Sequence, residues 1–239
     1  MSLSGIPKFS ETLWEWRSFS NRFHKTHLSR IRKLLLKFDR PTEMVDNYVW
    51  TPDCNLNVKL REQELKIKEL LGFQSQRLGN TLGTISNIER WTTEVYSFPI
   101  PAFTVKRVLR GLNISNMPEF SHMVEDKDRF INLLQSQSNS VRVLSISKQR
   151  EQHLLHLDED LTEKGDDKEL GKSVTIEISH LARPENVFTL SIEDRAIDNV
   201  IAAISKIMRS TDKRIYRGMI FMNYLQAVKV WGLGKRIFC

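Results

Sequence analysis

Residues 54–71 read CNLNVKLREQELKIKELL and contain two short alternating runs on either side of a polar turn. In the first run apolar side chains alternate with polar ones that include Lys59 and Arg61. In the second they alternate with Lys66 and Lys68. Successive side chains of a strand point to opposite faces, so each run has one apolar face and one basic face. The segment therefore predicts a β-hairpin whose two strands share a basic face.

Charged residues two positions apart recur in other segments that are predicted to be strands. Because such residues lie on the same face of a strand, each pair projects to one side of the predicted sheet. Two later strands add single acids. The pairs and acids are Glu15 and Arg17, Lys59 and Arg61, Lys66 and Lys68, Lys148 and Arg150, Glu177, and Glu193.

This charged face has two interpretations. An antiparallel sheet with one solvated side produces the same alternation. However, the pairs on three of the strands are entirely basic, and like charges directly opposite each other destabilise a sheet unless an anion lies between them. If the sheet curls into a barrel with this face inside, the lumen becomes a phosphate-binding site. The pattern favours the anion-binding face and leaves the solvated face open.

The rest of the chain divides into strands and helices by hydrophobic periodicity. Hairpin-spaced strands with grouped helices predict an α+β protein built on an antiparallel sheet or barrel. We expect strands at 12–20, 42–51, 54–61, 64–71, 88–98, 141–155, 174–181 and 187–193, and helices at 25–38, 102–112, 124–134, 196–208 and 219–230.

Length and composition indicate one domain spanning residues 1–239. Hydrophobic residues make up 40% of the chain, which is enough for a substantial core. The acidic stretch 158–172, DEDLTEKGDDKELGK, has little to bury, so we expect a mobile loop there. A net charge of +7 favours anionic partners. Cys54 and Cys239 form no CxxC motif, which argues against a disulfide scaffold and a thiolate zinc site.

The sequence also bears on location. The first residues lack an apolar core of signal-peptide length, and no apolar run is long enough to be a transmembrane helix. We therefore expect an intracellular protein, in the cytoplasm or an organelle matrix.

Two further features have both an ordinary and a functional interpretation. The five tryptophans could stack on bases, but large aromatic side chains more often fill a core, and we expect them there. The cluster Arg30-Ile31-Arg32-Lys33 could contact nucleic acid or lipid, although a solvated helix face is the simpler expectation.

Several short motifs occur in a fixed order along most of the chain. They are LWEWR at 13–17, DNY at 46–48, VKLR at 58–61, LKIK at 65–68, KQR at 148–150, VTIEI at 174–178 followed by LSIE at 190–193, and NYL at 223–225. This succession resembles the CYTH superfamily, the triphosphate tunnel metalloenzymes, which include thiamine triphosphatases, tripolyphosphatases and class IV adenylyl cyclases.

The resemblance implies a fold and a site. The fold would be an antiparallel barrel or tunnel of about eight strands flanked by helices. Mg²⁺ or Mn²⁺ would be bound by Glu15, Glu177 and Glu193, with Glu15 and Glu177 in catalytic roles. A triphosphate or polyphosphate would be bound by the basic residues Arg17, Lys59, Arg61, Lys66, Lys68, Lys148 and Arg150.

The chain departs from the family pattern at its first motif. Where the family has ExExK, the first glutamate position is Leu13 and the lysine position is Arg17. Arginine keeps an anion contact through a planar fork, but a lost carboxylate removes a candidate metal ligand.

Three functions follow from these observations. The first is metal-dependent hydrolysis of a small triphosphate such as tripolyphosphate, thiamine triphosphate or a nucleotide. The second is a non-catalytic module that binds a phosphorylated ligand or an RNA end. The third is a scaffold subunit whose basic face meets an acidic protein or nucleic acid. The missing glutamate favours the second over the first.

Overall fold

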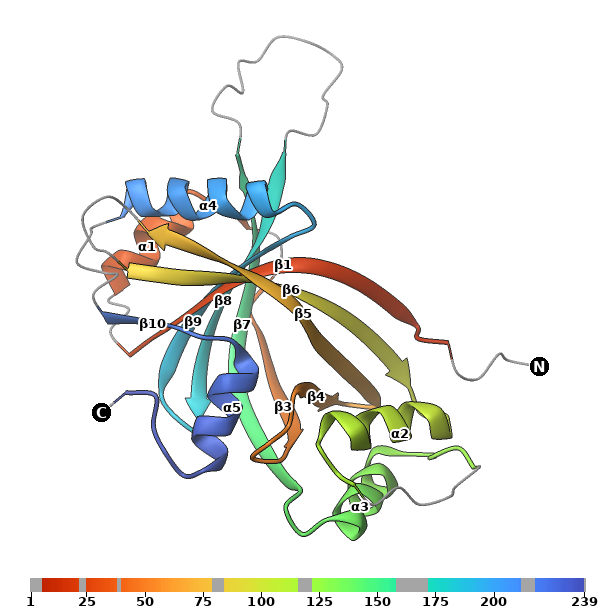
Figure 1. Cartoon of the computed structure of the whole chain (residues 1–239). Helices are drawn as coiled ribbons and strands as arrows, with labels where there is room; N and C mark the ends of the chain where they lie inside the picture. The colour runs from red at the N-terminus through yellow and green to blue at the C-terminus, as the bar shows by residue number, and fades with distance from the viewer. Residues whose placement is uncertain are drawn as a thin grey trace.

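The computed structural model describes residues 6–21, 25–37, 40–78, 84–115, 122–157, 172–211 and 218–238. Antiparallel strands dominate this part of the chain (Figure 1). The strands found in it are β1 (Phe9–Ser20), β2 (Leu36–Lys37), β3 (Thr42–Trp50), β4 (Leu56–Arg61), β5 (Glu64–Leu78), β6 (Thr84–Ser97), β7 (Arg142–His156), β8 (Ser173–Arg183), β9 (Val187–Asp194) and β10 (Met219–Phe221).

Eight of the described strands form a closed barrel. Their order is β1-β6-β5-β4-β3-β7-β8-β9, and β9 pairs back with β1. The second half of β1 closes the barrel, because Trp14–Ser20 pairs with β9 whereas the first half pairs with β6. The short strands β2 and β10 are added to β7 and β1. This architecture confirms the expected α+β fold and the expected antiparallel barrel of about eight strands flanked by helices.

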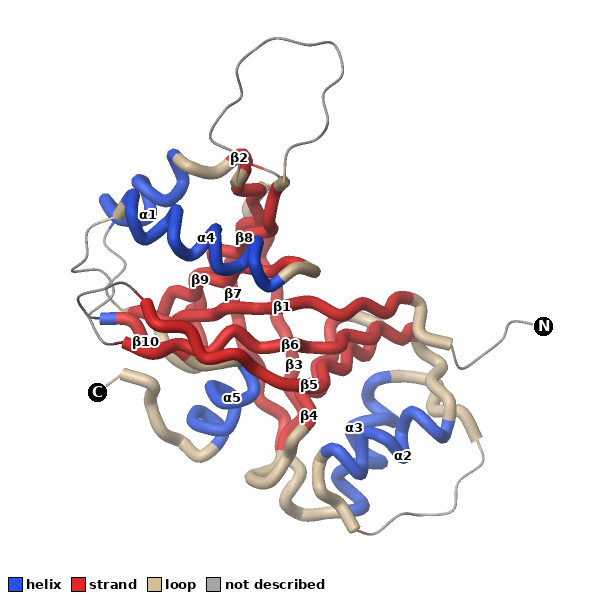
Figure 2. The backbone as a smooth tube through the Cα atoms, turned by 45° about the horizontal axis from the view of Figure 1, so that its top comes forward, coloured by secondary structure: helices blue, strands red, loops and turns tan. Residues whose placement is uncertain are grey.

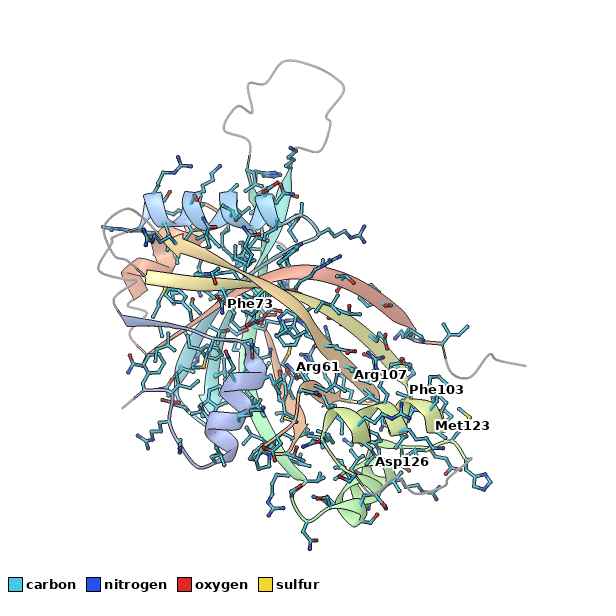
Figure 3. The ribbon with its side chains drawn as sticks, viewed as in Figure 1. Arg61, Phe73, Phe103, Arg107, Met123 and Asp126 are labelled. Atoms are coloured by element: carbon cyan, nitrogen blue, oxygen red, sulfur yellow. The ribbon has the colours of Figure 1, made fainter. Side chains whose placement is uncertain are left out.

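Helices cover the outside of the barrel and one of its ends. Figure 2 shows α4 lying across strands on one side, with α2 and α3 together at the other end. Arg107 of α2 pairs with Glu69 and Glu94 on β5 and β6, which fixes this helix to the sheet (Figure 3). The helices of the described residues are α1 (Lys25–Lys33), α2 (Ala102–Gly111), α3 (Lys127–Gln137), α4 (Ile197–Ser210) and α5 (Tyr224–Gly232).

Two apolar clusters stabilise the structure. One lies between α1, α4 and the outer faces of β1, β8 and β9. The other joins α2, α3 and α5 to strands that include β3, β4 and β5. Burial of their side chains is the main favourable contribution to folding. The tryptophans are largely core, as expected: Trp16, Trp50, Trp91 and Trp231 are each at most 5% exposed.

Two predicted helices were wrong in part. The helix expected at 25–38 ends at Lys33, and Leu36–Lys37 instead forms β2, paired with β7. The helix expected at 219–230 starts only at Tyr224, because Met219–Phe221 pairs with β1 as β10. In both cases a neighbouring strand supplies hydrogen-bond partners that the local sequence does not reveal. Asn223 and Gln226 form a capping box that starts α5, and this signal was readable in the sequence.

Other expectations are tested only in part. Arg30, Arg32 and Lys33 are exposed on α1, and Arg32 pairs with Glu151, so this cluster is a solvated helix face. Residues 158–171 of the predicted mobile loop lie outside the described residues. None of the described helices has the length and apolar character needed to span a membrane.

Candidate binding site in the barrel lumen

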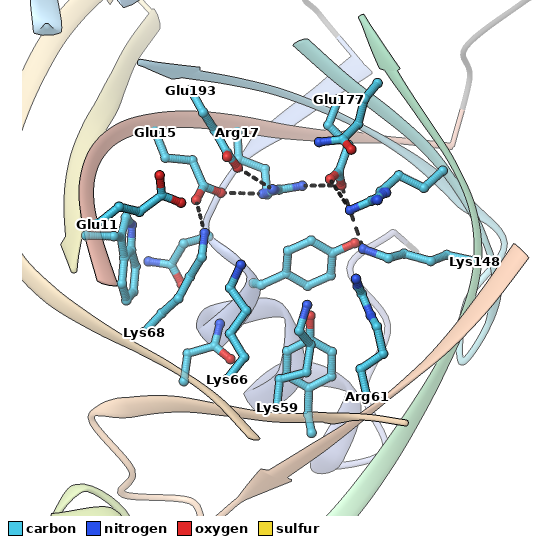
Figure 4. A pocket seen from close by; sticks show the side chains of 17 residues that line it. Glu11, Glu15, Arg17, Lys59, Arg61, Lys66, Lys68, Lys148, Glu177 and Glu193 are labelled. Carbon is cyan, nitrogen blue, oxygen red and sulfur yellow. Dashed lines mark hydrogen bonds and ion pairs between the residues drawn. The ribbon is translucent and has the colours of Figure 1, made fainter. Parts of the chain in front are cut away.

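The barrel lumen contains a polar cavity of about 180 Å³ (Figure 4). It lies between the strands, and its wall includes four glutamates, Glu11, Glu15, Glu177 and Glu193. More of the lining side chains are basic. The seven basic residues are Arg17, Lys59, Arg61, Lys66, Lys68, Lys148 and Arg150.

All ten site residues predicted from the sequence line this one cavity. The period-two alternation of the strands places them there, because the opposite faces of β4 and β5 pack into the apolar core. The charged face is therefore the inside of the barrel and not a solvated outer face. The roles assigned to these residues stay predictions.

Arg17 lies at the centre of the acidic part of the site. Its guanidinium approaches Glu15 at 2.7 Å, Glu193 at 3.6 Å and Glu177 at 3.8 Å. Burial alone would lower the pKa of Arg17, but Glu15 and Glu177 outweigh burial and raise it. Arg17 is therefore a permanent cation. Glu15 also accepts a hydrogen bond from Lys68 at 2.8 Å.

Asp46 lies behind the side chains that line the cavity and positions three cations of the basic part of the site. It is completely buried on β3. Arg61 donates to both of its oxygens, at 2.7 and 3.0 Å, and the ammonium groups of Lys148 and Lys59 lie 3.4 and 3.5 Å away. Burial would raise the pKa of Asp46, but Lys59, Arg61 and Lys148 hold it well below its usual range. One carboxylate thus orients three cations.

Glu177 connects the two parts of the site. It accepts a hydrogen bond from Ser179 at 3.0 Å and lies 3.7 Å from Lys148 and 3.9 Å from Arg150. Burial would raise its pKa, yet Lys148 and Arg17 hold the pKa well below its usual range. Glu177 is therefore ionised, and it shares its charge among several cations.

Several donors in the lumen have no protein acceptor among the described residues. The Lys66 ammonium has no carboxylate within ion-pairing distance, and its pKa is lowered by burial and by Lys68. The Nε of Arg150 and the hydroxyl of Tyr224 are buried without a hydrogen-bond partner. Buried donors without a partner are costly, so an acceptor-rich ligand would stabilise them.

Aromatic side chains close one side of the cavity. Tyr224, at the start of α5, stacks on Tyr48 with the ring centroids 5.7 Å apart. The Arg17 guanidinium lies 4.5 Å from the centre of the Tyr224 ring, and the Lys148 ammonium lies 5.2 Å from it. These cation–π contacts hold both cations at fixed positions in the lumen.

Sequence reasoning gave no role to Asp46, Tyr48 or Tyr224, although all three lie in motifs that resemble the family. Asp46 and Tyr48 are two apart on a strand and so share a face, which was a readable signal. Tyr224 reaches the lumen only because α5 packs against the barrel, and no local pattern predicts that contact.

The carboxylates fit a divalent metal poorly. Among the described residues, no three or more His, Cys, Asp or Glu side chains come together in a way that could bind a metal ion. Glu15, Glu177 and Glu193 all face the cavity, but the guanidinium of Arg17 lies between them. A metal ion in this place would meet a buried positive charge at close range.

Comparisons with known proteins give structural likeness alone. No family model and no curated protein sequence matches the chain. A candidate adenylyl cyclase from Hippeastrum, described as having a dominant triphosphatase activity, is 8% identical, with a TM-score of 0.44 and coverage of 95% of this chain and 98% of that one.

Two further solved structures are similarly distant. A conserved hypothetical protein from Pyrococcus furiosus is 12% identical over 89% of this chain and 98% of that one, with a TM-score of 0.42. A protein from Pyrococcus horikoshii is 14% identical over 94% and 99%, with a TM-score of 0.41. At these values none of the three assigns a function.

Proposed function

We propose that this CYTH-like barrel binds the phosphate chain of a small polyphosphate-containing ligand in its lumen. The observation that carries the proposal is the convergence of seven basic side chains on one cavity. The cavity also contains donor atoms without a protein acceptor among the described residues, namely the Lys66 ammonium, the Nε of Arg150 and the Tyr224 hydroxyl. A chain of phosphates supplies many acceptor oxygens and several negative charges in a small volume, which matches this wall.

The enclosure of the charges supports a small ligand. The side chains of Lys148 and Arg17 are 4% and 5% exposed, so they do not form an outer basic surface for an acidic protein or a nucleic acid duplex. Cations inside a narrow low-dielectric cavity attract an anion more strongly than exposed cations do. A cavity of about 180 Å³ is smaller than a typical pocket for a drug-sized molecule and suits a short phosphate chain.

The state of the carboxylates supports binding more than metal-dependent hydrolysis. Catalysis of the family type would use Glu15 and Glu177 to hold a metal or to position water. Here both are ion-paired with lumen cations, at distances from 2.7 to 3.9 Å. The same carboxylates serve a binding role directly, because they hold the cations apart and in fixed orientations.

Calorimetric titration with tripolyphosphate tests the proposal. We expect one site per chain and strong weakening as salt is raised, because charged contacts are screened. Changing Lys59 and Arg61 together to alanine removes two charge-assisted contacts, each contributing roughly 1.5–3 kcal/mol, so affinity should fall at least about ten-fold. Parallel titrations with orthophosphate and with a nucleoside triphosphate show whether binding needs more than one phosphate and whether the site accepts a nucleoside.

The matched control removes two exposed basic residues of α1, Arg30 and Lys33, by the same change to alanine. This variant has the same net charge as the lumen variant and should bind tripolyphosphate like the unchanged protein. If both variants lost the same affinity for tripolyphosphate, the binding would depend only on the net charge of the protein, and this result would contradict the proposal. Phosphate release measured with Mg²⁺ or Mn²⁺ tests hydrolysis, and turnover that depends on Glu177 would favour the enzyme.

A further inference from the structure

The position of Arg17 among the glutamates indicates whether the ligand is bound with or without a divalent metal ion. The three carboxylates that approach its guanidinium come from β1, β8 and β9. Strands β8 and β9 form a hairpin, and β1 meets this hairpin because the barrel closes. Arg17 is 6% exposed, donates to Thr189 at 3.4 Å and lies over the ring of Tyr224. A cation is therefore already held at the centre of the acidic cluster by contacts on every side.

The oxygens of two of these carboxylates, Glu15 and Glu177, have other partners as well. Both oxygens of Glu15 are used, one by Arg17 and one by Lys68. Glu177 contacts Ser179, Lys148 and Arg150 in addition to Arg17. A divalent metal bound here would have to displace the guanidinium or accept its repulsion.

The first glutamate position of the family motif adds no ligand. Leu13 occupies it and pairs with Trp91 across β1 and β6, so an apolar pair stands where the resemblance implies a carboxylate. Both the sequence at Leu13 and the ion pairs of Arg17 therefore indicate that the acidic part of the lumen binds a guanidinium group and not a metal ion.

We infer that Arg17 is the resident cation of this site, and that the lumen takes its polyphosphate ligand free of divalent metal. The inference rests on the proposed function and deepens it by naming the form of the ligand. Arg17, together with Lys68 beside Glu15 and Lys148 beside Glu177, offsets the charge of the glutamates. Lys59, Lys66, Arg61 and Arg150 also line the lumen and can meet the phosphate oxygens. A magnesium complex of the same anion is less negative, and the metal occupies some of its oxygens.

Titration of the unchanged protein with tripolyphosphate, in chelator or in excess Mg²⁺ at equal ionic strength, tests this inference. We expect full affinity in chelator and a several-fold loss in Mg²⁺, which sequesters the free anion. Tighter binding with Mg²⁺ than in chelator would overturn the inference and leave the proposed function standing. Absence of binding in both conditions would overturn both.

Manganese binding gives an independent measurement. The electron paramagnetic resonance signal of free Mn²⁺ should persist when the unchanged protein is added, and stoichiometric loss of the signal would overturn the inference. Arg17→Gln removes the cation and should create Mn²⁺ binding, whereas Arg110→Gln on the exposed face of α2 should not. A folded Arg17→Gln protein that binds no Mn²⁺ would also contradict it. If Arg17→Gln fails to fold, the tripolyphosphate titration and the Mn²⁺ measurement on the unchanged protein still test the inference.

Discussion

Lys59 on β4 and Lys66 on β5 lie directly opposite each other, and both face the barrel lumen. Lys59 lies 3.5 Å from Asp46, whereas Lys66 has no ion-pair partner among the described residues. Like charges in direct register destabilise a sheet. The ligand-free barrel therefore contains a repulsion that a bound anion would relieve, and this links stability to binding.

Replacing Lys66 with glutamine should raise stability and weaken binding at the same time. Relief of a cross-strand repulsion contributes roughly 0.2–1 kcal/mol, which corresponds to a rise in Tm of about 0.4–4 °C for a chain of this size. Tripolyphosphate affinity should fall, because an unpaired donor is lost. Thermal unfolding and calorimetric titration measure the two effects. Lys33→Gln on exposed α1 is the control and should change neither, and a lower Tm for Lys66→Gln would contradict the repulsion.

Stability of the ligand-free protein should rise with pH across the range between the lowered folded pKa of Lys59 and its unfolded value of about 10.4. Burial lowers the pKa of Lys59 well below its ordinary value, and Lys148 and Arg61 lower it further. Between the folded pKa and the unfolded value of about 10.4, the unfolded chain binds more protons, so stability increases with pH. Denaturant unfolding at several pH values measures the slope. Lys59→Met should flatten it, and an unchanged slope in that variant would exclude Lys59 as the source.

Replacing Asp46 with asparagine should destabilise the protein strongly. It leaves Lys59, Arg61 and Lys148 without their shared carboxylate, and breaking a buried ion pair typically costs about 3–5 kcal/mol. Tm should fall by roughly 6–20 °C. Adding tripolyphosphate should raise the Tm of this variant by more than it raises the Tm of the unchanged protein, because the anion replaces the missing negative charge. Asp53→Asn in an exposed turn is the matched control, and equal losses in both variants would argue against the role given to Asp46.

Acid should remove the contribution of Glu15 below about pH 4. Burial alone would raise the pKa of Glu15, but Lys68 and Arg17 hold it at about 2. A carboxyl with a lowered folded pKa stabilises the protein above its unfolded pKa of about 4.3, and this contribution is lost as pH falls toward 2. Acid titration of the free energy of unfolding should be flatter for Glu15→Gln than for Glu43→Gln, an exposed control. Identical curves would show that Glu15 has no such contribution.

Replacing Glu177 with glutamine separates a binding site from a metal enzyme. The change keeps the shape of the side chain and removes a negative charge beside Lys148 and Arg150. A metal-free site should then bind tripolyphosphate equally well or more tightly, as measured by titration in chelator. If the unchanged protein releases phosphate with Mg²⁺ and the variant loses that turnover, Glu177 acts on a metal and the binding-only proposal fails.

Much of the barrel was predictable because the period of a strand is local. Alternation in 54–71 placed Lys59, Arg61, Lys66 and Lys68 on one face, and the same rule placed Lys148 and Arg150. The hairpin of β4 and β5 follows from the short polar turn between them. By contrast, β2 and β10 are too short to produce a pattern, and they form because β7 and β1 offer pairing edges.

By itself, the sequence determined which side chains share a face of each strand, and therefore that the basic ones would converge if the sheet closed. Only the tertiary structure decided how their charges are matched. Arg17 and Glu193 lie far apart in the chain and meet because β9 pairs with β1, and Asp46 reaches Lys148 because β3 pairs with β7. An ion pair depends on distances of a few ångströms between strands, and these are set by barrel closure and not by any local repeat.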